Sequence, residues 1–139
     1  MSSVSAVFVN DRAEIQRVAE LAERFGADER LSDDDVMAIN LVLDEVVANI
    51  IEYGYDDTAR HEIRVTLTRE GDALTIEVED DARAFDPLQA PEPDLDLPLE
   101  ERPVGGLGIH IVRSVMDAVE YRRRDGHNIL IMRRTIGRT

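Results

Sequence analysis

The chain has 139 residues, of which 43% are hydrophobic and 33% charged, a balance that suits one domain with a single hydrophobic core. Its formal net charge of −14 argues against nucleic acid as a direct partner, because phosphate binding needs a basic surface. The absence of cysteine excludes disulfides and thiolate metal sites.

Two further features of composition narrow the class of protein. The sequence has no apolar run of about 18 residues and no signal peptide, so we expect a cytoplasmic protein without a membrane span. All 16 basic residues are arginine. The P-loop and the usual protein-kinase fold each require a lysine, so both of these nucleotide-binding folds are excluded.

The chain begins with a short strand followed by an amphipathic helix. Residues 4–9 are rich in β-branched side chains and end at the turn-prone Asn10, which is typical of a strand. Apolar residues then recur at helical spacing over residues 12–25. Gly26 follows directly, and we expect it to cap the C-terminus of this helix.

A second, longer helix carries two polar side chains of interest. Ser32 and the three aspartates after it indicate a helix start, and the apolar periodicity runs to about Tyr53 and breaks at Gly54. Glu45 and Asn49 lie one turn apart among apolar neighbours, where each must be paired or must meet a ligand. Together they could serve one bound ion, although a solvated polar stripe has the same spacing.

Four further segments predict strands, arranged as two hairpins. Residues 61–68 and 73–80 alternate apolar and polar side chains and are joined by a four-residue turn. Residues 118–123 and 128–135 form the second predicted pair, around a turn at 124–127. The apolar face of the first pair needs a layer of helices to cover it.

Between the hairpins lies an irregular segment that leads into a third helix. Residues 83–104 contain all five prolines of the chain, and such a segment is typical of a functional lid or of disorder. Gly105, Gly106 and Gly108 then open a helix expected at about 107–118. Backbone N–H groups at a helix start bind anions, and glycine lets a phosphate approach closely. An ordinary helix-entry turn is the alternative.

The third polar feature is the acidic end of a strand. Asp80 and Asp81 close the strand at 73–80, and Phe85 follows. A carboxylate beside an apolar pocket can accept a hydrogen bond from an exocyclic amine such as that of adenine. An acidic turn on an acidic protein is the alternative for this feature taken alone.

Three helices that cover one face of an antiparallel sheet of four or five strands make a two-layer α/β sandwich of the α+β class. We expect one domain over residues 1–139, with the lid at about 83–106. The order of Glu45 with Asn49, Asp80, the lid and the glycines resembles the GHKL or Bergerat-fold ATPases. Over nearly its whole length the chain is similar to their anti-sigma-factor serine kinase branch.

This resemblance implies roles for individual residues and implies ATP and Mg²⁺ as cofactors. Asn49 would contribute an oxygen to Mg²⁺, and Glu45 would take the place of the general base. Asp80 would read the adenine amino group, with Ala82 and Phe85 beside it in the nucleotide site. The lid and helix entry would wrap the phosphates through Gly105, Gly106, Leu107 and Gly108.

The cation that would meet the γ-phosphate is assigned to Arg102, with Arg83 as its competitor.

The chain also departs from the family at several positions. The family's first glycine box normally reads Asp-x-Gly, whereas this chain has Ala82 and Ala84. If the backbone there has φ > 0, alanine costs about 1 kcal/mol; otherwise its methyl group narrows the adenine pocket. Tyr53 replaces a histidine that is common in the family.

The resemblance therefore implies a serine kinase that binds a sigma factor and phosphorylates a small, STAS-like antagonist of the anti-sigma factor. It also implies a homodimer. Two alternatives remain open: a partner-switching module that needs no nucleotide, and a detached catalytic domain of a histidine kinase.

Overall fold

The computed structural model describes residues 1–89 and 106–137. The strands are β1 (Ser2–Val9), β2 (Glu62–Glu70), β3 (Ala73–Asp80), β4 (Ala118–Arg124) and β5 (His127–Thr135). The helices are α1 (Ile15–Asp28), α2 (Asp33–Tyr53) and α3 (Gly106–Val115), with short 3-10 turns η1 (Arg12–Glu14) and η2 (Pro87–Gln89). The sheet has the order β1-β2-β3-β5-β4, and every neighbouring pair is antiparallel.

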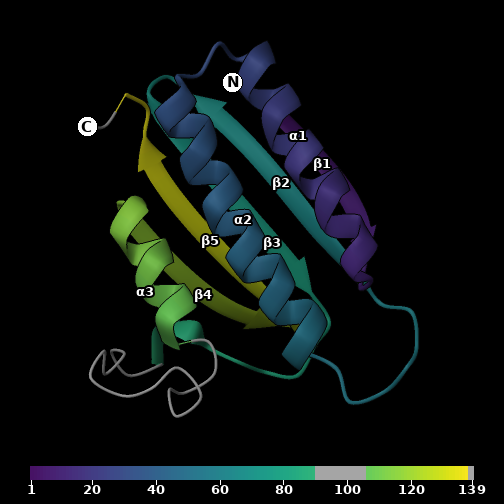
Figure 1. Ribbon diagram of the computed structural model, residues 1–139. Coiled ribbons are helices and arrows are strands. Elements are labelled where there is room, and N and C mark those ends of the chain that lie inside the picture. Colours follow the sequence, from purple (N-terminus) through teal and green to yellow (C-terminus); the bar gives the residue numbers. More distant parts are fainter. Residues whose placement is uncertain (90–105, 138–139) are drawn as a thin grey trace.

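The three helices of the described residues lie on one face of the sheet, with α1 beside β1 and α2 crossing the middle (Figure 1). Alternate residues of the central strands point toward these helices and are fully buried: Ile63, Val65, Leu67, Leu74, Ile76 and Val78. The α2 helix contributes four buried side chains to the same core: Ile39, Val42, Leu43 and Val47. This architecture confirms the predicted α+β sandwich.

The end of α1 differs from the prediction. Gly26 lies inside the helix, which continues to Asp28. A Cβ atom at Gly26 would lie 2.4 Å from Cγ2 of Val36, so this glycine permits the close approach of α1 and α2. The left-handed residue that follows the helix is Arg30 (φ 55°), and the next N–H, of Leu31, donates to the Gly26 carbonyl at 2.8 Å. The prediction of a Gly26 cap was wrong because glycine marks tight packing as well as helix ends.

The start of α2 is hydrogen-bonded to the C-terminal end of β5. Ser32 caps the helix as predicted, since its Oγ accepts the N–H of Asp35 at 3.2 Å. The buried Asp35 carboxylate accepts from Nε of Arg134 at 3.0 Å and from the N–H of Gly137 at 3.0 Å. Nη1 of Arg134 also donates to the carbonyl of Val115, the last residue of α3, at 2.8 Å. One ion pair therefore joins α2, α3 and β5.

Turn chemistry explains the β4–β5 hairpin. Asp125 (φ 53°) and Gly126 (φ 79°) both have left-handed backbone, as a two-residue type I′ turn requires. No helix in the described part of the chain is long and apolar enough to cross a membrane.

Candidate functional site

A cavity of about 370 Å³ lies between the C-terminal half of α2, the end of β3, the start of α3 and the strands β4 and β5. Most of its lining side chains are apolar, with a few polar groups among them. Six residues selected from the sequence line it: Glu45, Asn49, Asp80, Ala82, Phe85 and Gly108. Residues separated by more than 60 positions are thus brought to one site.

The start of α3 rests on the polar face of α2. A Cβ atom at Gly108 would lie 2.7 Å from Oε2 of Glu45 and 3.2 Å from Nδ2 of Asn49. Only a residue without a side chain leaves both groups in place at this distance. The contact therefore sets the start of α3, the end of a helix whose N–H groups and dipole favour anions in general, beside a carboxylate and an amide.

Asp80 also lines the cavity and is buried, with 5% of its surface exposed. Its Oδ1 accepts the N–H of Ala82 at 2.9 Å and Nδ2 of Asn128 at 3.0 Å. Burial raises the pKa of Asp80, while the hydrogen bonds from Asn128 and Ala82 act in the opposite direction. A buried carboxylate that keeps its hydrogen bonds can accept a further one from a ligand in the cavity.

Ala82 sits in place without backbone strain. Among the described residues other than glycine, only Arg30 and Asp125 have positive φ. A Cβ atom at Gly54 would lie 2.8 Å from the Cβ of Ala82, so the glycine makes room for this methyl group. The first of the two effects considered from the sequence, a cost of about 1 kcal/mol for left-handed backbone, therefore does not apply. The second effect stays a prediction; the methyl group does line the cavity.

Sequence reasoning missed Asn128 of β5, which lies opposite Asp80 in the β3–β5 register. Besides Asp80, its Nδ2 donates to the carbonyl of Arg83 at 2.9 Å. Its Oδ1 accepts from the Tyr121 hydroxyl at 2.5 Å and from Nη1 of Arg123 at 3.0 Å. The available signal was one amide on a strand face that continues with Leu130 and Met132. A buried polar side chain among core residues needs a partner.

The remaining candidate residues have less defined positions relative to the cavity, and some of them lie outside the described residues. Arg83 pairs with Asp56 at 3.0 Å on the exposed loop after α2. Gly106 and Leu107 are the first two residues of α3. Arg102 and Gly105, like most of the predicted lid, lie outside the described residues. Tyr53 and Phe85 line the cavity with half of each side chain exposed.

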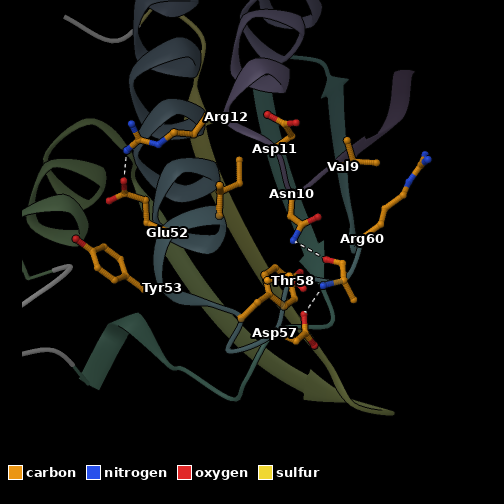
Figure 2. Close-up of a pocket in the computed structure, with 12 residues that line it drawn as sticks. Val9, Asn10, Asp11, Arg12, Glu52, Tyr53, Asp57, Thr58 and Arg60 are labelled. Carbon is orange, nitrogen blue, oxygen red and sulfur yellow. Dashed lines mark hydrogen bonds and ion pairs between the residues drawn. The ribbon is translucent and has the colours of Figure 1, made fainter.

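A second, open hollow of about 990 Å³ lies beside the C-terminal end of α2, toward the loop that leads to β2 (Figure 2). Its polar groups largely bind one another. Arg12 pairs with Glu52, and Nδ2 of Asn10 donates to the Ala59 carbonyl at 3.3 Å. The predicted site residues Glu45, Asn49 and Asp80 line the smaller cavity, which we therefore take as the candidate site.

Comparison with known proteins defines the class. Residues 8–134 match the family of histidine kinase-like ATPase domains, and the chain belongs to this family. The resemblance to the GHKL ATPases is thereby confirmed. The chain is 32% identical over 94 residues to the serine/threonine-protein kinase BtrW of Bordetella bronchiseptica, a match that covers 68% of this chain and 66% of that protein. It is 25% identical over 118 residues to the serine-protein kinase RsbW of Bacillus cereus, covering 82% and 71%.

Solved structures show the same fold. The RsbU and RsbW domains of a Mycobacterium tuberculosis protein superpose with a TM-score of 0.72 at 14% identity, over all of this chain and 34% of that chain. A blue-light activated histidine kinase from Erythrobacter litoralis gives a TM-score of 0.58 at 17% identity, over 89% of this chain and 41% of that chain. The chain thus spans less than half the length of either structure.

Proposed function

We propose that the protein is a Mg²⁺- and ATP-dependent serine kinase that acts as an anti-sigma factor. In this role it binds a sigma factor and phosphorylates a small, STAS-like antagonist, and it forms a homodimer. One observation carries the proposal: Glu45 and Asn49 meet the start of α3 in a cavity that Asp80 also lines. Relatives named as serine kinases support the choice of reaction.

The base of the nucleotide is assigned to the Asp80 side of the cavity. The carboxylate accepts a hydrogen bond from the exocyclic amine, and the ring lies among apolar side chains. These lining residues come from four elements and the segment after β3: Ile50, Val78, Phe85, Ile109 and Leu130. An apolar surface with the Asp80 carboxylate as hydrogen-bond acceptor fits the adenine ring and its amine.

The phosphates are assigned to the start of α3, beside Asn49. The backbone around Gly108 would give them close access and the N–H donors of a helix start, and the amide oxygen of Asn49 would be the protein ligand for Mg²⁺. Mg²⁺, when bound, neutralises charge on the phosphate oxygens. The described residues contain no cluster of three or more His, Asp or Glu side chains able to hold a metal, which suits an ion held mainly by phosphate and water. Arg102 remains our candidate for the γ-phosphate.

Glu45 is assigned as the general base. As the serine oxygen of the antagonist attacks the γ-phosphorus, its proton passes to the Glu45 carboxylate and the bond to ADP breaks. The position of Glu45 supports this role, because its carboxylate lies against the helix start to which the phosphates are assigned. Asn49, one turn later on α2, positions the nucleotide and takes no proton.

The test is transfer of radiolabelled phosphate from ATP, with Mg²⁺, to purified STAS-like antagonists. Glu45→Ala should stop serine labelling and leave ATP binding, measured by calorimetry, within a factor of a few. Asp44→Ala is the matched control, since this neighbouring carboxylate is exposed and should be dispensable. Labelling that survives Glu45→Ala would remove Glu45 from its role.

A partner-switching module that needs no nucleotide is the second candidate. The buried methyl group of Ala82 favours it, because this group occupies space at the Asp80 side of the cavity. Calorimetry with ATP and Mg²⁺ separates the two functions. Binding in the micromolar range supports the kinase, and sigma-factor binding without any nucleotide affinity supports the module.

A further inference from the structure

Asn128 is held in one orientation by its neighbours. The side chain is 7% exposed, and its Oδ1 accepts from Arg123, whose guanidinium can only donate. Its Nδ2 faces two acceptors, the Asp80 carboxylate at 3.0 Å and the Arg83 carbonyl at 2.9 Å. Rotating the amide by half a turn would set oxygen against oxygen and nitrogen against nitrogen. The amide is therefore committed to donating to Asp80.

This donation determines what Asp80 can offer a ligand. Both hydrogen bonds that the described residues make to the carboxylate fall on Oδ1, from Ala82 and Asn128. Two N–H donors stabilise the ionised form, which can only accept hydrogen bonds. A protonated carboxyl group would instead donate. The ionised form suits an exocyclic amine, and the protonated form suits a carbonyl group in the same place.

We propose that Asn128 is a positioning residue that keeps Asp80 a hydrogen-bond acceptor and thereby makes the cavity select adenine over a base with a carbonyl group at that position. The proposal rests on the nucleotide-binding function above and adds to it a determinant of base specificity. Asn128 acts through Asp80, because its own polar atoms are already engaged.

The other groups around Asp80 determine how strongly its pKa depends on the hydrogen bond from Asn128. Burial raises the pKa of Asp80, and the neighbouring Asp81 adds to the rise. The Arg123 guanidinium on β4 opposes it, and the Tyr55 phenol, whose own pKa is raised by burial, stays neutral. Removing the Asn128 donor therefore lets Asp80 take a proton at higher pH.

The experiment measures binding of ATP and of inosine triphosphate, which carries a carbonyl group in place of the amine, by calorimetry with Mg²⁺ between about pH 5 and pH 8. The wild-type protein should prefer ATP by roughly tenfold or more, the worth of one hydrogen bond to a charged group. Asn128→Leu should reduce this preference roughly tenfold and shift the loss of ATP binding to higher pH. Asn128→Thr retains a hydroxyl donor and should recover part of the preference.

The control is Asn40→Leu, the same change on α2 at a residue that does not line the cavity. If Asn128→Leu does not fold, Tyr121→Phe deletes only the O–H donor to Asn128. This variant should also lower the preference for ATP over inosine triphosphate and shift the loss of ATP binding to higher pH. A folded Asn128→Leu with an unchanged ratio and pH profile overturns the proposal, as does a wild-type protein that binds both nucleotides equally. Absence of all nucleotide binding would overturn the proposed function as well.

Discussion

Gly108 and Glu45 are in direct contact: a Cβ atom on the glycine would lie 2.7 Å from Oε2 of the carboxylate. Gly108→Ala should therefore displace Glu45 and Asn49 while leaving the fold intact, because both affected groups are the ends of side chains. We expect phosphate transfer to fall at least roughly tenfold and Tm to change little, since alanine is the better helix former by about 1 kcal/mol.

Labelling of the antagonist and thermal unfolding measure the two effects of Gly108→Ala. Ser114→Ala, an exposed position of the same helix, serves as the control. Full activity in Gly108→Ala would show that the contact does not position Glu45.

Gly54 and Ala82 share one space, and a double-mutant cycle can test this. Gly54→Ala should destabilise the protein by about 1–3 kcal/mol through overpacking against Ala82. Adding Ala82→Gly should recover part of the loss; the remainder reflects the Ile50 carbonyl, which would lie 2.6 Å from the new methyl group. Urea unfolding gives the four free energies, and strict additivity would exclude the shared space.

The buried ion pair between Asp35 and Arg134 should dominate the stability of this end of the molecule. Arg134→Leu leaves the Asp35 carboxylate buried without its cation and should cost about 3–5 kcal/mol. The neighbouring Arg133→Leu, at an exposed position, should change stability by less than about 1 kcal/mol. Equal losses in the two variants, measured by urea unfolding, would contradict a special role for the pair.

His61 should make the loop before β2 sensitive to pH. Its Nε2 and Nδ1 lie 2.8 Å from Asp57 and 3.3 Å from Asp81, and hydrogen bonds to these carboxylates raise the pKa of His61. The ring also stacks on Tyr55, with 4.0 Å between centroids. Because the folded pKa is the higher one, the added stability is complete below the unfolded pKa of about 6.5 and is lost as pH rises through the folded value.

An NMR titration should place the pKa of His61 above about 6.5. The difference in Tm between the wild-type protein and His61→Gln should shrink as pH rises through that pKa. A difference in Tm that does not vary with pH would show that the ring acts by packing alone.

The fold followed from local patterns because its strands alternate cleanly and its long helix is capped and amphipathic. Gly26 was misread because a local pattern does not reveal that another helix packs at that point. At the site, Glu45 and Asn49 share one helix face, so spacing alone places them together. Asn128 escaped because its partner lies 48 residues away across a pairing register that no local signal specifies.

The ion pair of Arg134 with Asp35 also touches the end of α3 through the Val115 carbonyl. It thus joins the start of α2 to the end of α3, whereas Glu45 and Gly108 meet nearer the opposite ends of these helices. The ion pair thus connects α2 and α3 at one end, and residues nearer their other ends line the cavity. The ion pair is therefore one of the contacts that set the position of α3 against α2, and with it the position of Gly108 beside Glu45.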